Sequence, residues 1–258
     1  MTDKKLVVDV SKWNYPVDFN RLKKAGVSGV IIRAGSGNKK DERFEEYAQE
    51  AIAMGLDIGF YWFVYIHSGK TITENAVQFD AVIRPYKDHI ALKVWCDYEY
   101  DTDEKLQKYD GDTLNKNDRT RLVLDFCGTM QFYGYECGVY ANRDYYTTKL
   151  DAKRISNLPL WYARYTTAED DTAKDAYMWQ FSSKYNVGGK LYDCSYLKPK
   201  VFPAITVTQA FNACGIPSNY AKRVRIALEN GMDGYSGRAE ENAELVKLLA
   251  EGKLKNPF

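Results

Sequence analysis

The chain has little net charge and few histidines. Its 36 Lys and Arg residues almost balance 35 Asp and Glu residues, and the net charge is +1. A chain without a basic surplus lacks the electrostatic signature of a protein that binds nucleic acid or anionic lipid. Its 2 histidines, His67 and His89, are too few for an ordinary zinc site. We predict no nucleic-acid partner, no metal and no cofactor.

Long apolar runs and paired cysteines are also missing. The longest apolar stretch, 58–66, is about half a membrane span, and Asp9 interrupts the start before a signal-peptide core could form. The cysteines are odd in number and form no C-x-x-C motif, which is typical of reduced, buried thiols. We therefore predict no membrane insertion and no signal peptide. The 5 cysteines are Cys96, Cys127, Cys137, Cys194 and Cys214.

Strand-like and helix-like segments alternate as far as about residue 197. This alternation predicts parallel strands with right-handed crossovers, and eight strands favour closure into an irregular (β/α)8-type barrel with full helices mainly in its first half. An open doubly wound sheet is the alternative, but Ser11-Lys12-Trp13-Asn14 follows the first strand where that fold has a glycine-rich turn. The expected strands are 6–10, 30–34, 58–64, 92–98, 138–141, 160–164, 177–181 and 191–196, and the expected helices are 19–25, 42–54, 73–84 and 118–133.

The remaining residues predict a second, smaller domain. We expect the barrel to occupy residues 1–197 and a linker with two prolines to occupy 198–206. A small α-helical domain should follow at 207–258, with helices at 219–229 and 238–250. About 50 residues give a thin core, so this domain should lean on the barrel or on a second copy of itself.

Two carboxylates close the fourth expected strand. In Val94-Trp95-Cys96-Asp97-Tyr98-Glu99, strand alternation points Asp97 and Glu99 to the same side, about 6.6–7 Å apart along the chain. Burial and mutual repulsion would raise the pKa of at least one, as a proton donor near neutral pH requires. Barrel enzymes place catalytic groups at this end of the strands. A solvated start of a loop would also explain the pattern.

Further acids favour the catalytic interpretation. Asp9 lies in the first expected strand and Asp193 in the last, and these strands are neighbours in a closed barrel. Four converging acids without a basic cluster suggest glycoside hydrolysis or a divalent-metal site. The sequence contains no G-x-S-x-G motif, which would indicate a serine hydrolase. The 21 Tyr and 5 Trp residues suit a surface that stacks on sugar rings.

Several short motifs together resemble glycoside hydrolase family 25, the lysozymes (N-acetylmuramidases), most nearly the phage endolysin type with a C-terminal cell-wall-binding module. The resemblance runs in order from about residue 5 to 197. Cys96 and Cys194 beside the acids, and the polar segment 101–117, depart from the family pattern. The motifs are Asp9-Val10-Ser11-Lys12-Trp13, Arg33, Phe60-Tyr61-Trp62-Phe63, Asp97-Tyr98-Glu99, Tyr140-Ala141-Asn142, Leu160-Trp161-Tyr162-Ala163, Trp179-Gln180-Phe181 and Asp193.

The resemblance implies cleavage of the β-1,4 bond between N-acetylmuramic acid and N-acetylglucosamine in peptidoglycan, for lysis of a bacterial host. Glu99 would be the general acid and base, and Asp97 the nucleophile or the group that orients the substrate acetamido. Asp9 and Asp193 would tune the pair, and retention of configuration is expected. The enzyme would be made in the host cytoplasm and act on the wall after release. A non-catalytic peptidoglycan-binding protein is the alternative, which the presence of Glu99 disfavours.

Other residues are candidates for contacts with the glycan strand. Gln180 could bind a sugar hydroxyl, and Arg33, a cation in an apolar strand, calls for an acidic partner. The C-terminal domain would bind cell-wall carbohydrate, or alternatively mediate self-association. The aromatic candidates, each of which could instead belong to the core, are Tyr61, Trp62, Tyr98, Tyr140, Trp161 and Trp179.

Overall fold

The computed structural model describes residues 4–198 and 206–258. The chain divides into two compact units, Met1–Lys198 and Pro199–Phe258. Almost all of the expected linker, 198–206, lies outside the described residues. No helix within the described residues is long and apolar enough to cross a membrane.

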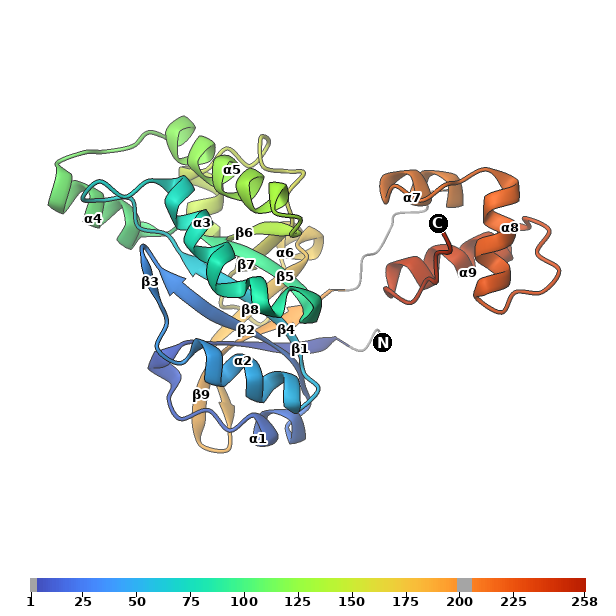
Figure 1. Ribbon diagram of the computed structural model, residues 1–258, viewed down its shortest axis with the longest axis horizontal. Helices are drawn as coiled ribbons and strands as arrows, with labels where there is room; N and C mark the ends of the chain where they lie inside the picture. The colour runs from blue at the N-terminus through green and yellow to red at the C-terminus, as the bar shows by residue number, and fades with distance from the viewer. Residues whose placement is uncertain (1–3, 199–205) are drawn as a thin grey trace. The chain divides into compact units, whose positions relative to one another are not determined.

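Eight strands of the first unit close into a barrel (Figure 1). The hydrogen-bonded order is β1-β9-β8-β7-β6-β5-β4-β2, and pairing of β1 with β2 completes the ring. A short strand, β3 (Lys39–Lys40), adds to β2. The predicted barrel is therefore confirmed. Its strands are β1 (Lys5–Val10), β2 (Val27–Ser36), β4 (Asp57–Phe63), β5 (Ile90–Asp97), β6 (Cys137–Asn142), β7 (Leu160–Ala163), β8 (Met178–Val187) and β9 (Lys190–Leu197).

The last strand departs from the expected parallel arrangement. β9 is antiparallel to both β8 and β1. Gly188 and Gly189 alone connect β8 to β9, with φ of +59° and +89°. A connection this short can form a hairpin but cannot cross the barrel to start a parallel strand. The expectation of all-parallel strands is wrong at this position for that reason.

Full helices cover the first half of the barrel and short ones the second half, as predicted. The longest helix that the sequence analysis missed is α4 (Tyr100–Asp110), which buries only Thr102 and Leu106 and so has almost no apolar periodicity. The other segments are the 3₁₀ turn η1 (Lys12–Asn14), α1 (Phe19–Lys24), α2 (Phe44–Ala53), α3 (Ile72–Ile83), the 3₁₀ segment η2 (Arg84–His89), α5 (Lys116–Phe132), the π turn η3 (Tyr145–Lys149) and α6 (Asp171–Asp175).

The first unit has two apolar layers. Side chains inside the barrel, among them Val7, Ile31 and Trp161, form one layer. Those between the strands and helices, including Phe44 and Phe126, form the other. Because successive side chains of a strand point to opposite faces, adjacent residues belong to different layers.

The described residues of the second unit, 206–258, contain three helices, α7 (Val207–Ala213), α8 (Tyr220–Glu229) and α9 (Ala239–Ala250). Arg223 Nε donates to the Tyr235 hydroxyl at 3.0 Å, and that hydroxyl donates in turn to Asn242. The sequence predicted the last two helices but not α7. The second unit has its own core, which contains Val207, Phe211, Ile226, Ala227, Tyr235 and Leu245.

Two glycines test the packing of the barrel. A Cβ at Gly59 would lie 2.8 Å from Ile31 Cδ1 and from two backbone carbonyl oxygens, whereas one at Gly128, an exposed position of α5, meets nothing within 4 Å. We expect Gly59→Ala to destabilise the fold by about 2–3 kcal/mol because backbone must move. Gly128→Ala should stabilise it by about 0.5–1 kcal/mol through helix propensity. Chemical denaturation of both variants measures the difference, and equal stabilities would contradict this packing.

Candidate active site

Four carboxyl groups converge at one end of the barrel. Asp97 is the last residue of β5, and Glu99 follows in extended backbone (φ −128°, ψ −178°) as the N-cap of α4. The strand alternation therefore continues through Glu99, and its side chain makes no capping hydrogen bond. Asp9 and Asp193 are directly paired residues of β1 and β9. Paired side chains share a face, with Cβ atoms about 4.5–5.5 Å apart.

Burial is the main cause of altered acidity in this group. It raises the pKa of Asp9 and of Asp97 well above the usual range, and the nearest neighbouring charges, Asp193 and Glu99 respectively, raise each further. It also raises the pKa of Glu99, and that of Asp193 to about 6. These carboxyls therefore hold their protons to a higher pH than exposed carboxyls do.

Asp97 and Glu99 are close enough to share a proton. Oδ1 of Asp97 is buried and has no partner while both groups are ionised, because a carboxylate can only accept. One proton allows a side-chain hydrogen bond between the two carboxyls, which raises the pKa of Asp97 and lowers that of Glu99. A proton on either carboxyl would supply the hydrogen-bond donor that Asp97 Oδ1 lacks.

Gln180 joins the acids to two tyrosines. Its Nε2 donates to Asp9 Oδ2 at 2.8 Å, and its Oε1 accepts from the hydroxyls of Tyr140 and Tyr165 at 3.0 Å each. These three bonds fix the orientation of the amide. Tyr165 is missing from the sequence prediction because it follows β7 in a loop that has no periodic pattern. Its ring is 54% exposed, so it borders solvent at the site.

Arg33 has an acidic partner, but it is none of the four acids. Its Nε and Nη2 atoms donate to Asp41 Oδ2 at 2.7 and 2.6 Å. Asp41 also accepts from the backbone N–H of Lys12 and of Arg43. The charge of Arg33 lowers the pKa of Asp97, in opposition to burial. Asp41 lies in the charged stretch Lys39-Lys40-Asp41-Glu42-Arg43, where no pattern distinguishes it from its neighbours.

Three of the predicted aromatic residues lie inside the barrel. Trp161 is only 2% exposed and donates from Nε1 to Ser195 Oγ at 3.0 Å, so it forms the floor under the acids. The rings of Tyr140 and Tyr61 pack edge-on against it, with centroids 4.7 and 6.2 Å away. Burial, and then the charge of Asp9, raise the pKa of Tyr61.

The other three aromatic predictions are corrected by strand parity. Trp62, Tyr98 and Trp179 each stand one position away from an inward residue and are buried on the outer face of the barrel. Trp62 donates to Asn75 Oδ1 and Trp179 to the carbonyl of Arg164, at 3.1 and 2.9 Å. Their positions exclude direct contact with a ligand in the barrel mouth.

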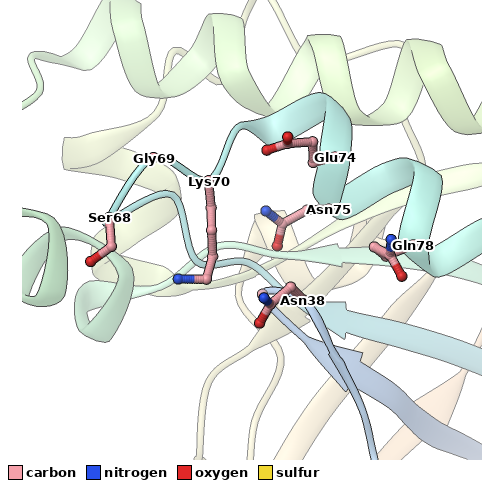
Figure 2. Close-up of a pocket in the computed structure, with 8 residues that line it drawn as sticks. Asn38, Ser68, Gly69, Lys70, Glu74, Asn75 and Gln78 are labelled. Atoms are coloured by element: carbon pink, nitrogen blue, oxygen red, sulfur yellow. The ribbon is translucent and has the colours of Figure 1, made fainter.

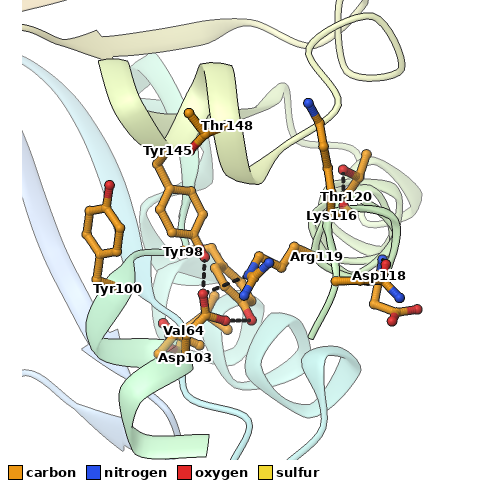
Figure 3. A network of polar contacts seen from close by, with 12 residues as sticks. Val64, Tyr98, Tyr100, Asp103, Lys116, Asp118, Arg119, Thr120, Tyr145 and Thr148 are labelled. Atoms are coloured by element: carbon orange, nitrogen blue, oxygen red, sulfur yellow. Dashed lines mark hydrogen bonds and ion pairs between the residues drawn. The ribbon is translucent and has the colours of Figure 1, made fainter. Parts of the chain in front are cut away.

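Tyr98 belongs to a polar network that holds α4 (Figure 3). Asp103 accepts from the hydroxyls of Tyr98 and Tyr145, at 3.1 and 2.9 Å, and from Arg119 Nε at 2.7 Å. The network ties the first turns of α4 to β5, η3 and α5. Because Glu99 is the N-cap of α4, these bonds also fix its backbone.

The comparison with known families agrees with this geometry. The model described as "Glycosyl hydrolases family 25" matches residues 8–190. The chain belongs to this family.

Individual relatives support the assignment to family 25. An autolytic lysozyme of Clostridium acetobutylicum is 25% identical over 183 residues, which cover 70% of this chain and 52% of the relative, so the chain spans about half that protein's length. The CTP1L endolysin structure has a TM-score of 0.61 at 26% identity, covering 75% of this chain and 66% of that one. A family 25 glycosyl hydrolase from Bacillus anthracis shares the fold, with a TM-score of 0.63 at 20% identity and coverage of 76% and 90%.

The acidic cluster of this family 25 chain is not arranged as a metal centre. Among residues 4–198 and 206–258, no three His, Cys, Asp or Glu side chains are placed to hold a metal ion together. The cluster instead has a hydrogen bond from a neutral amide: Gln180 Nε2 donates to Asp9 Oδ2.

The raised pKa of Asp193 makes stability depend on pH. The folded chain holds this proton with a pKa of about 6 against an ordinary 3.8. The resulting stabilisation is complete below about pH 4 and is lost as pH rises through about 6. As pH rises through this range, the free energy of unfolding of Asp193→Asn should fall by on the order of 1 kcal/mol less than that of the wild type, after allowance for solvent screening.

Thermal unfolding at about pH 4, 5, 6 and 7 measures this effect. The exposed Asp112→Asn is the matched control because it removes the same charge away from the cluster. Parallel curves for the wild type and Asp193→Asn would show that Asp193 has an ordinary acidity.

Proposed function

We propose that this chain is a peptidoglycan hydrolase, a lysozyme of the endolysin type that cleaves the β-1,4 bond between N-acetylmuramic acid and N-acetylglucosamine. The observation that carries the proposal is the neighbouring pair Asp97 and Glu99, in which burial raises both pKa values and each carboxyl alters the acidity of the other. Membership of family 25, and the lysozyme and endolysin among the relatives, support the same reaction class.

In this reaction Glu99 protonates the leaving glycosidic oxygen. Glu99 is less enclosed than Asp97, which is only 5% exposed, so it is the member of the pair that a bound glycan can reach. Transfer of the shared proton along the hydrogen bond to Glu99 leaves Asp97 anionic next to the forming oxocarbenium ion. Glu99 then acts as the base that activates the incoming water.

The direct effect of each carboxyl on the pKa of the other supports retention of configuration. Inverting glycosidases separate their carboxyls by about 6.5–9.5 Å, which is too far for a hydrogen bond between them. With retention, either Asp97 attacks the anomeric carbon or it orients the acetamido group whose oxygen attacks. Both routes need an ionised Asp97. Asp9 and Asp193 add negative potential that stabilises the positive charge of the transition state.

The inward polar groups supply contacts for the sugar. Tyr61, Tyr140, Tyr165 and Gln180 surround the acids with hydroxyl and amide groups. The exposed ring of Tyr165 also offers an apolar face for a pyranose ring.

Replacing Glu99 by Gln tests the reaction and its proton donor together. The amide has the same size but cannot donate a proton of suitable acidity, so we expect less than about a tenth of the wild-type rate while fold and wall binding persist. Purified Gram-positive walls would be digested, reduced with borohydride and analysed by mass spectrometry. Glu104→Gln, an exposed position on α4, is the control and should stay fully active.

The ends of the released fragments decide the bond that is cleaved. Reduced muramic acid ends that are absent with Glu99→Gln would support the muramidase. Reduced glucosamine ends would indicate a glucosaminidase, and no new ends would indicate a protein that only binds the wall.

We further propose that the second unit binds cell-wall carbohydrate. It has its own apolar core, and attachment to the wall raises the effective concentration of substrate for the barrel. Phe211 is fully buried in that core.

A buried charge should therefore unfold the second unit selectively. We expect Phe211→Asp to abolish co-sedimentation of the Glu99→Gln protein with walls, because the folded unit would be lost. In the active background, cleavage of soluble glycan fragments should continue. Unchanged co-sedimentation would argue against wall binding by this unit, and a change in mass by light scattering would indicate self-association instead.

A further inference from the structure

A polar pocket lies beyond the carboxyl ends of β2 and β4 (Figure 2). It has a volume of about 280 Å³. One wall is the turn at Gly37 and Asn38, directly after β2, and another is the loop Ser68–Lys70 that follows β4. β4 pairs with β5 so that Phe63 is opposite Asp97, and Val64 N–H donates to the Asp97 carbonyl at 2.9 Å. The pocket and the acids thus open at ends of neighbouring strands.

The walls of the pocket are held in place before any ligand arrives. Asn75 is 1% exposed, and its amide uses its full capacity to bind Trp62, Thr71 and both backbone groups of Tyr65. Gly37 has a φ of +58° and donates to the Phe63 carbonyl at 3.0 Å. On the far side of the loop, Ser68 N–H donates to Asp110 Oδ2 at 2.8 Å. Binding would therefore require little ordering of the loop.

Several polar groups in the pocket retain unused capacity. Within the described residues, the amides of Asn38 and Gln78 make no hydrogen bond to another residue, and Lys70 makes no ion pair. Lys70 Nζ has one long bond, 3.3 Å, to the carbonyl of His67. Glu74 binds Thr71 through Oε2 alone, which leaves Oε1 available. The pocket offers one cation, one anion and two amides.

We propose that this pocket binds the peptide stem of peptidoglycan, with Lys70 on a stem carboxylate and the amides of Asn38 and Gln78 on its peptide groups. The inference rests on the proposed function, because muramic acid residues of the substrate carry short peptides with free carboxylates. A glycan strand across the acids presents such stems to the rim beside them. A stem with a diamino acid also has an ammonium group, which can donate a hydrogen bond to the carboxylate of Glu74.

Binding of a synthetic stem peptide tests the proposal without any catalysis. Isothermal titration of the whole chain with an L-Ala-γ-D-Glu-L-Lys-D-Ala peptide should show saturable binding, weakened about fivefold to tenfold by Lys70→Met because a charge-assisted hydrogen bond is lost. The same peptide with its carboxylates amidated should bind wild type and Lys70→Met equally. Gln78→Leu, a second variant, should weaken binding of both peptides.

Lys39→Met is the matched control, since it removes a lysine from β3 that does not line the pocket. It should bind the peptide like the wild type. Equal weakening of peptide binding by Lys39→Met and Lys70→Met would show that only the net charge of the protein matters, and it would overturn the proposal. The absence of peptide binding by the wild type would also overturn it.

Hydrolysis rates then connect the pocket to the reaction. The ratio of kcat/KM on stem-bearing walls to that on glycan stripped of stems by an amidase should fall about fivefold with Lys70→Met and stay at the wild-type ratio with Lys39→Met. A ratio unaffected by Lys70→Met would overturn a role for the pocket in substrate choice. Peptide binding without cleavage of either substrate would contradict the muramidase and leave the binding site standing.

Discussion

Burial of four carboxyl groups in one barrel mouth is the constraint on which the other features of the site depend. Each additional negative charge in this enclosed space raises the energy of the next, so the group retains protons. Gln180 stabilises Asp9 by donating to it, and two tyrosine hydroxyls hold that amide in position. Arg33 moderates the field at Asp97, while its own ion pair with Asp41 keeps it from neutralising the acids outright. The result is a pair, Asp97 and Glu99, that loses its protons at higher pH than exposed carboxyls do, which favours general acid catalysis.

The topology of the barrel brings these acids together from distant parts of the chain. Closure between β1 and β9 places Asp9 opposite Asp193, 184 positions later in the sequence. An antiparallel last strand puts Asp193 within the strand pair rather than at the end of a parallel strand. Asp97 and Glu99 are instead neighbours in the sequence. They share a face because extended backbone continues past the end of β5 before α4 begins. The network around Asp103 then fixes the helix that starts at Glu99.

The sequence revealed the acids because charges inside apolar runs are rare and costly, and the order of the strands brought Asp9 and Asp193 to one seam. It was less informative about aromatic residues, since Tyr61 and Trp62 have similar chemistry and only the strand parity separates the barrel interior from the outer layer. Applying the parity of Asp97 to Tyr98, and that of Gln180 to Trp179, would have excluded both. Asp41 and Tyr165 lie in loops, where no period constrains the side chain. α4 escaped prediction because its single thin line of buried residues, Thr102 and Leu106, resembles a polar loop.

The separation of the two apolar layers explains how the chain supports so costly a site. The outer layer, where Trp62, Phe79 and Phe126 pack between strands and helices, contains no member of the acidic cluster. Its burial stabilises the barrel at every pH, whereas the ionisation of the acids opposes folding mainly above about pH 4. The inner layer has a second function, because Trp161 and Tyr140 exclude water beneath the acids and so maintain their raised pKa. The outer faces of the strands thus stabilise the fold, and the inner faces maintain the raised pKa values of the acids. Adjacent residues such as Tyr61 and Trp62 therefore have different roles.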